Sequence, residues 1–197
     1  SYTYDDGEID EVLVVIRDAD GDVIEDRDYD FDDVDSIVVD AKDGNDTVIN
    51  NTDISMTAVG GAGNDTLIGG SQADNLYGGT GNDSLVGNNG NDFIDGQAGN
   101  DTVRGGNGND NLYGSDGDDR IYGDNDNDNM YGGNGTDRMY GGNGNDNMRG
   151  EAGTDFMYGG NNNDTVDGGA GNDYLYGDAG NDRIYGRDGN DYMRGGT

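Results

Sequence analysis

The sequence predicts an all-β repeat protein, and two observations support this prediction. From residue 60 to residue 194 the chain divides into fifteen consecutive units of nine residues, with no insertion or deletion. In every unit the first residue is glycine, the sixth is aspartate and the eighth is apolar. A fixed period of this kind is typical of architectures in which one small structural unit is stacked many times.

Each position of the unit has a physical role. The seventh to ninth residues predict a three-residue strand, in which alternation places the eighth residue on one face and its neighbours on the other. The six residues before it must turn the chain, and their glycines supply backbone conformations with positive φ. Asparagine at position five is expected to tolerate the same conformations. The unit is therefore predicted to be a glycine-rich turn followed by a short strand.

The composition raises a difficulty that the fold must solve. The 197 residues include 43 acidic and 10 basic side chains, which gives a net charge of −33, and only 30% of the residues are hydrophobic. Composition alone would indicate a disordered chain, whereas the strict period indicates an ordered one. Something must neutralise the carboxylates before the chain can become compact, and cations are the obvious candidates. Nucleic acid is not expected as a partner, since the sequence has no basic patch to meet phosphates.

Missing residue types exclude several other classes of protein. The chain contains no cysteine and no histidine, so a disulfide framework is excluded and a zinc site is not expected. No apolar stretch approaches the roughly 18–20 residues that span a bilayer. The chain begins at Ser1 without a methionine or a signal-like segment, which we interpret as a processed or excised form.

The chemistry of the turn favours calcium. A loop rich in glycine brings backbone carbonyl oxygens close together without side chains between them, and one aspartate per loop adds a charged oxygen. Carbonyls and carboxylates are the hard oxygen ligands that calcium prefers, at six to eight per ion in flexible geometry. Magnesium demands a stricter octahedron, which such a loop suits less well.

The units also resemble a known family. The stretches "GGAGNDTLI", "GGNGNDNLY" and "GGAGNDYLY" are similar to the RTX (haemolysin-type) calcium-binding nonapeptide, which matches residues 60–196 densely and has an isolated copy at 43–48. The resemblance implies a parallel β-roll in which two consecutive units form one coil, with odd and even units on opposite sides. It also implies that calcium lies between loops stacked on the same side, and that the eighth-position side chains fill a thin core.

The resemblance assigns the metal ligands residue by residue. The expected carboxylate ligands are the sixth-position aspartates and one early equivalent: Asp46, Asp65, Asp74, Asp83, Asp92, Asp101, Asp110, Asp119, Asp128, Asp137, Asp146, Asp155, Asp164, Asp173, Asp182 and Asp191. The expected carbonyl ligands include Gly61, Gly63, Gly79, Gly81, Gly106, Gly108, Gly133, Gly135, Gly142, Gly144, Gly169 and Gly171. We expect on the order of a dozen calcium ions. Because stacked aspartates repel one another without metal, folding and binding should be one event.

Some units depart from the pattern. The fourth glycine is replaced by Gln72, Asp126 and Asn162, of which Gln72 is expected to give the weakest site and Asn162 to keep its turn. The second glycine is replaced in seven units, by Asn88, Gln97, Ser115, Asp124, Glu151, Asp178 and Arg187. These replacements should matter less, since a backbone carbonyl is present whatever the side chain.

Residues 1–59 differ from the array and are predicted to form an N-terminal β cap with the first calcium loop, before a β-roll over residues 60–197. The stretch "EVLVVIRDADGDVIEDRDYDF" predicts a hairpin, and further strands are expected at Val48–Ile49 and Asp53–Val59. Within it, "DADGD" resembles the start of an EF-hand loop but lacks the following glutamate, so an acidic turn is the better interpretation.

Aromatic residues recur at the ninth position. Tyr122, Tyr140, Tyr158 and Tyr176 occur in every second unit, so they are expected to form an outward ladder on one face. The ladder could be a lateral contact or a carbohydrate-stacking surface. Alternatively, aromatic residues could stand there because they favour strands and pair well between them.

The functional prediction is an extracellular, secreted calcium-binding structural protein without enzymatic activity. The sequence ends at "YMRGGT", three residues into a new unit, where a solenoid normally needs a cap. We therefore expect head-to-tail self-assembly into a surface or matrix filament, with residues 1–10 as the docking segment. The alternative is that the chain is a calcium-triggered folding and secretion module of a larger type I-secreted toxin, enzyme or adhesin.

Overall fold

The computed structural model describes residues 11–17, 23–30 and 35–197 as an all-β solenoid. Within these residues there is no helix long and apolar enough to cross a membrane. The strands are β1 (Glu11–Arg17), β2 (Val23–Asp30), β3 (Ile37–Asp40), β4 (Thr47–Ile49), β5 (Met56–Ala62), β6 (Thr66–Ile68), β7 (Asn75–Thr80), β8 (Ser84–Asn89), β9 (Phe93–Ala98), β10 (Thr102–Asn107), β11 (Asn111–Asp116), β12 (Arg120–Asn125), β13 (Asn129–Gly135), β14 (Arg138–Asn143), β15 (Asn147–Gly153), β16 (Phe156–Asn161), β17 (Thr165–Gly171), β18 (Tyr174–Ala179), β19 (Arg183–Asp188) and β20 (Tyr192–Arg194).

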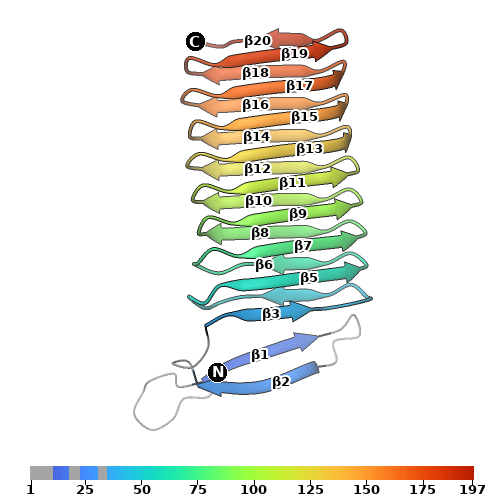
Figure 1. Ribbon diagram of the computed structural model, residues 1–197, viewed down its shortest axis with the longest axis vertical. Helices are drawn as coiled ribbons and strands as arrows, with labels where there is room; N and C mark the ends of the chain where they lie inside the picture. Colours follow the sequence, from blue (N-terminus) through green and yellow to red (C-terminus); the bar gives the residue numbers. More distant parts are fainter. Residues whose placement is uncertain (1–10, 18–22, 31–34) are drawn as a thin grey trace.

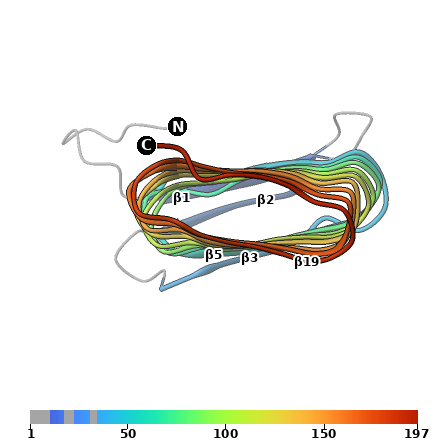
Figure 2. The same ribbon diagram turned by 90° about the horizontal axis from the view of Figure 1, so that it is seen from above.

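From β3 onward the chain winds into a stack of flat coils (Figure 1). Each coil gives one strand to each of two sheets, which face one another across a narrow interior (Figure 2). Within each sheet the strands of the array are parallel, and each residue pairs in register with its equivalent two units along the chain, as Leu112 does with Met130. Odd and even units therefore lie on opposite sides, and the predicted parallel β-roll is confirmed.

The hairpin expected near the N-terminus is present. β1 and β2 pair antiparallel, with Glu11 opposite Asp30 and a register shift at Ile16/Arg17, and β1 joins the larger sheet through the pair Arg17 and Thr47. In Figure 1 the two strands lie at the β3 end of the array. The "DADGD" segment and the docking segment 1–10 fall outside the described residues.

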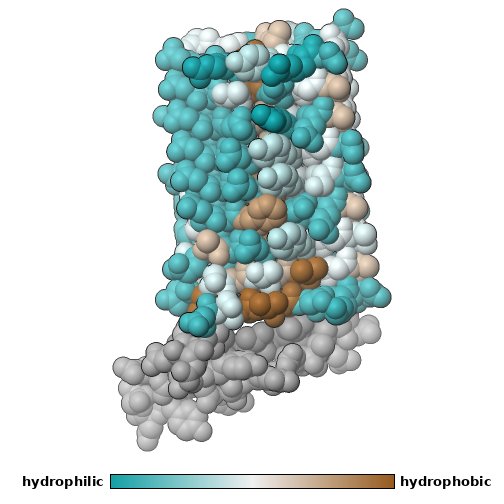
Figure 3. All heavy atoms as spheres, in the orientation of Figure 1, coloured by the Kyte–Doolittle hydropathy of each residue, from teal (hydrophilic) through white to brown (hydrophobic). Residues whose placement is uncertain are grey.

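The core is one side chain thick. The eighth-position residues from Leu67 to Leu175 are all 0% exposed, and Ala58, which pairs with Leu76, continues the row into β5, where Met56 is also buried. Ile184 is only partly buried and Met193 is 53% exposed, because within this chain no later coil covers them. The outer surface is largely hydrophilic, with only small apolar patches on the face shown in Figure 3.

The strands are longer than the three residues that the unit predicted. Most run for six or seven residues, from position seven of one unit to position three or four of the next, as in β12 and β13. The prediction treated the glycines as turn residues only. In the structure the first glycine is a buried strand position that points inward, where it has no side chain to add to the thin core.

Two methionines at the same unit position allow the core to be tested. We expect Met139→Ala, at a site that is 0% exposed, to lower the free energy of unfolding of the calcium-loaded protein by about 2–5 kcal/mol, because it leaves a cavity. The matched control Met193→Ala should change it by less than about 0.5 kcal/mol. Urea titration followed by circular dichroism measures both, and equal losses would contradict the assignment of the core.

Candidate metal-binding loops

The loops stack directly on one another along both edges of the solenoid. A Cβ added to Gly81 would lie 1.7 Å from the carbonyl oxygen of Gly63, one coil below, and one added to Gly79 would lie 2.0 Å from that of Gly61. The position-two and position-four carbonyls of one coil therefore point at the loop of the next. Such close approach, together with φ values of +117° and +129° at Gly79 and Gly81, is what requires glycine there.

Residues with side chains at these positions keep the turn by adopting a tighter left-handed conformation. The seven replacements of the second glycine have φ between 65° (Asp178) and 79° (Ser115), and Asp126 and Asn162 at position four have 74° and 81°. The expectation that Asn162 keeps its turn is confirmed, whereas the smaller effect of the second-position replacements on metal binding stays a prediction. Each such residue costs roughly 1–2 kcal/mol of backbone strain, which the stacked loops must offset.

The sixth-position aspartates form a buried ladder along each edge. The backbone N–H of Asp101 donates to Oδ1 of Asp119 at 2.7 Å, and that of Asp119 donates to Oδ1 of Asp137 at 2.9 Å. Asp101, Asp119 and Asp137 are all 0% exposed. One oxygen of each carboxylate thus holds the coil below it in register.

The second carboxylate oxygen is different, because it is buried without a hydrogen-bond donor. This holds for Oδ2 of thirteen aspartates: Asp65, Asp83, Asp92, Asp101, Asp110, Asp119, Asp128, Asp137, Asp146, Asp155, Asp164, Asp173 and Asp182. An ionised carboxylate oxygen in that position is strongly unfavourable unless a proton or a cation accompanies it.

The unpaired oxygen faces the first glycine of its own unit. A Cβ on Gly78 would lie 2.4 Å from Asp83 Oδ2 and 2.6 Å from the carbonyl oxygen of Gly96 in the coil above. A carboxylate oxygen and a carbonyl oxygen therefore converge on one small volume that only glycine leaves open. The sequence held a signal for this role, since the first glycine is never replaced whereas the second is replaced in seven units.

Asparagine at position five has a role that the sequence analysis missed. No fifth-position residue of the array has positive φ, so that expectation was wrong. Instead the side chain accepts from the coil above: the backbone N–H of Asn82 donates to Oδ1 of Asn64, and that of Asn100 donates to Oδ1 of Asn82, both at 2.7 Å. Position five thus supports the coil above and position six the coil below.

Asp74 stands apart from the other aspartates. Its Oδ2 accepts the backbone N–H of Gly70 and its Oδ1 that of Met56, both at 2.6 Å, so neither oxygen lacks a donor. The same loop contains Gln72, and neither Gly70 nor Gln72 has positive φ. Protein groups therefore satisfy both oxygens of Asp74, and the weakness of this loop as a metal site stays a prediction.

Burial raises the pKa of the ladder aspartates from Asp65 to Asp173, because desolvation penalises the charged form. The pKa of Asp128 rises to about 8 and those of Asp92 and Asp119 to about 7, from an ordinary value of 3.8. The backbone N–H bonds act in the opposite direction, while the charges of Asp110 and Asp146 raise the pKa of Asp128 further. The protein groups of the ladder by themselves therefore oppose full ionisation of these carboxylates.

The donor set fits a hard cation. In the described part of the chain no group of three or more acidic, histidine or cysteine side chains could hold a metal ion by itself. A bound ion would combine one or two carboxylate oxygens with backbone carbonyls, which is the mixture that calcium accepts. The solenoid and its loops thus define a repeat protein with metal-binding turns.

The comparison with family models agrees with this definition. The model described as RTX calcium-binding nonapeptide repeat (4 copies) matches residues 57–85, 68–103, 77–112, 104–139, 131–166, 140–175 and 167–197. These matches cover most of the chain, which therefore belongs to the RTX calcium-binding nonapeptide repeat family, a family whose repeats bind calcium. No curated protein matches the sequence.

The raised pKa values predict an unusual pH dependence without calcium. The folded-state pKa values of about 6 to 8 lie above the unfolded value, so the associated stability is present in acid and is lost as pH rises through that range. In calcium-free buffer we expect β-structure to increase between about pH 8 and about pH 5, measured by circular dichroism. Saturating calcium should flatten this dependence, and β-structure that decreases toward acid without calcium would contradict it.

Proposed function

We propose that the protein is an extracellular calcium-binding structural protein whose β-roll folds as calcium binds. The observation that carries the proposal is the row of buried Oδ2 atoms without donors, which only a proton or a cation can stabilise. At neutral pH an oxygen-ligated calcium ion suits this position best, and the family matched by residues 57–197 binds that ion.

The proposed ligands are the sixth-position aspartates and the glycine-region carbonyls. Each ion would take Oδ2 of an aspartate such as Asp83 together with carbonyl oxygens from positions one, two and four of neighbouring coils. Thirteen aspartates offer such an oxygen, which supports the expectation of about a dozen ions. Asp74 is left out of the proposed set, since protein donors already satisfy it.

Folding and binding are coupled in this proposal. In the ladder each carboxylate has like charges one coil above and one coil below, as Asp92 has Asp110 and Asp74. A chain with net charge −33 has too few cationic side chains to relieve this repulsion along the loops. Where calcium is scarce the chain would remain expanded, and where it is abundant the coils would close.

The last coil supports a proposal about assembly. Among the strands that the structure describes, β20 pairs with β18 alone, and Met193 and Tyr192 are 53% and 52% exposed, whereas most residues equivalent to Met193 in earlier coils are buried. A second copy that docks its first coils onto β19 and β20 would cover this surface, and repeated contacts would give a head-to-tail filament. Lateral contacts through the tyrosine ladder would join filaments side by side.

A second function fits the same surface. The array could be the calcium-triggered folding and secretion module of a larger type I-secreted toxin, enzyme or adhesin, whose adjoining segment covers the last coil. The family match favours both functions equally. The family is a structural calcium-binding repeat and not a catalytic one, and either function uses the array in that way. We propose no catalysis by residues of the array in either case.

Asp119 and Asp74 test the proposed ligands. We expect Asp119→Asn to reduce the number of bound calcium ions and to raise the calcium concentration needed for half-maximal folding, because it removes a buried ligand charge. Asp74→Asn should leave the number of ions unchanged. Equilibrium dialysis with calcium counts the ions, and a loss of ions in Asp74→Asn equal to that in Asp119→Asn would overturn the assignment.

Sedimentation velocity separates the two functions. In chelator we expect a slow, expanded species, because the carboxylates repel one another. In millimolar calcium the filament proposal expects large species that dissociate when calcium is removed, whereas the module alternative expects a compact monomer. An unchanged sedimentation coefficient on adding calcium would contradict both.

A further inference from the structure

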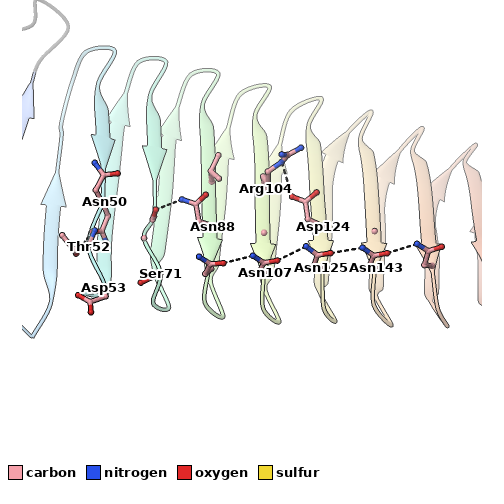
Figure 4. A pocket seen from close by; sticks show the side chains of 18 residues that line it. Asn50, Thr52, Asp53, Ser71, Asn88, Arg104, Asn107, Asp124, Asn125 and Asn143 are labelled. Atoms are coloured by element: carbon pink, nitrogen blue, oxygen red, sulfur yellow. Dashed lines mark hydrogen bonds and ion pairs between the residues drawn. The ribbon is translucent and has the colours of Figure 1, made fainter.

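A groove runs along the outside of the array, beside the loops whose position-two carbonyls are proposed metal ligands. It has a volume of about 1090 Å³ and extends from the loop at Asn50–Asp53 across successive coils to Asn161. Figure 4 shows its labelled residues in rows parallel to the solenoid axis, with Asn107, Asn125 and Asn143 in one row and Arg104 and Asp124 beside it. Neither the metal chemistry nor the core packing requires such a groove.

Three rows of residues build it, all on the sheet that contains β8, β10, β12, β14 and β16. The position-nine row begins with Val86 and Arg104 and continues in register to the tyrosine ladder from Tyr122. The position-two row alternates residues that have a side chain, Asn88 and Asp124, with the glycines Gly106 and Gly142. The position-three row is asparagine in five consecutive coils: Asn89, Asn107, Asn125, Asn143 and Asn161.

The asparagine row is a continuous amide ladder. Nδ2 of each residue donates to Oδ1 of the asparagine one coil below, at 2.7 Å from Asn107 to Asn89 and 2.8 Å from Asn125 to Asn107. Each interior amide therefore uses one N–H and one lone pair of its oxygen within the ladder. One N–H and one lone pair of each amide remain available for another partner. These side chains are exposed, so the free donor and acceptor face the groove at every coil.

The tyrosine ladder continues the position-nine row beyond the residues that line the groove, and its ring faces are not open. Tyr122, Tyr140 and Tyr158 stack on one another with centroids 5.0 and 5.2 Å apart and planes within 7°. Their faces are therefore used within the ladder, which leaves ring edges and phenolic hydroxyls for outside contacts. A carbohydrate-stacking surface made of open ring faces, one of the two sequence-based interpretations, does not fit this geometry.

The charge of the groove excludes most kinds of polymer. The one cation among its lining residues, Arg104, is paired with Asp124 at 3.3 Å, and the chain as a whole carries −33. Acidic polysaccharides and nucleic acids would be repelled. A protein partner would need apolar anchors or a free strand edge, whereas the groove has only Val86 as a large apolar side chain and its central strands are paired on both sides.

We propose that this groove binds a neutral polysaccharide in extended form. Sugar hydroxyls both donate and accept hydrogen bonds, and each asparagine offers the matching pair. The five asparagines span four steps of about 4.8 Å, or about 19 Å, in a straight line along the axis. This length suits several sugar residues of a chain and not a single monosaccharide, so affinity should rise with chain length. In the proposed extracellular setting, such binding would attach the array to a glycan surface.

Affinity electrophoresis in gels that contain hydroxyethyl cellulose or galactomannan tests this proposal on the calcium-loaded protein. We expect these neutral polymers to retard it, and alginate, which is acidic, not to. Asn125→Ala should weaken retardation by neutral polymer roughly five- to tenfold, the value of a hydrogen-bonding amide. The matched control is Asn134→Ala, at the same unit position on the opposite sheet, where Nδ2 donates to Asp116 Oδ1 at 2.7 Å.

A second pair of variants keeps the proposal testable if the alanine variants do not fold. Asn125→Asp keeps the size of the side chain but replaces the donor by a carboxylate, and Asn134→Asp makes the same change on the other face. Circular dichroism in calcium must show folded protein for each variant that is compared. The proposal is overturned if no neutral polymer retards the protein, if alginate retards it more strongly, or if the Asn134 variants lose as much binding as the Asn125 variants. These outcomes do not depend on whether calcium-loaded chains assemble into filaments.

Discussion

A buried carboxylate oxygen with no hydrogen-bond donor is the constraint on which the rest of this structure depends. Each sixth-position aspartate uses Oδ1 to hold the coil below and leaves Oδ2 against the first glycine of its unit. Thirteen such oxygens in one small array would be untenable as bare charges, since desolvation and mutual repulsion both oppose ionisation. In the proposed function the fold therefore depends on a cation, or on protonation in acid, and calcium has the role that a larger hydrophobic core has in an ordinary domain.

The rest of the unit follows from this requirement. The core can remain one side chain thick because the loops, once neutralised, supply the register that core packing usually gives. Glycine at position one leaves the space where carboxylate and carbonyl oxygens converge, and glycine at positions two and four lets loops stack at contact distance. Asparagine and aspartate at positions five and six satisfy backbone N–H groups in opposite directions along the axis. Because every coil depends on its neighbours, the residues at each position have similar surroundings throughout the array.

The outer faces are free of these constraints, and there the sequence varies. Positions seven, nine and three carry tyrosine, arginine, asparagine, threonine or acidic residues without disturbing the coil, because they are at least partly exposed. Where one residue type recurs in every second unit it forms a row, and the asparagine and tyrosine rows lie on the same sheet. A solenoid thus converts a sequence period into a surface period, which suits partners that are themselves repetitive. The groove between the rows is a feature that neither calcium binding nor core packing requires.

The sequence by itself determined the all-β class, the period, the buried eighth position and the calcium chemistry, because a strict repeat forces equivalent residues into equivalent environments. It also singled out the unit of Gln72, whose loop differs from the others in the structure. Only the tertiary structure decided what depends on neighbouring coils: that position five caps the coil above, that Asp74 is satisfied by Gly70 and Met56, and that strands extend through the first glycine. The partners in these contacts lie in other units, so no single unit reveals them. The groove is of the same kind, since it exists only where Asn107, Asn125 and Asn143 are brought into line by parallel stacking.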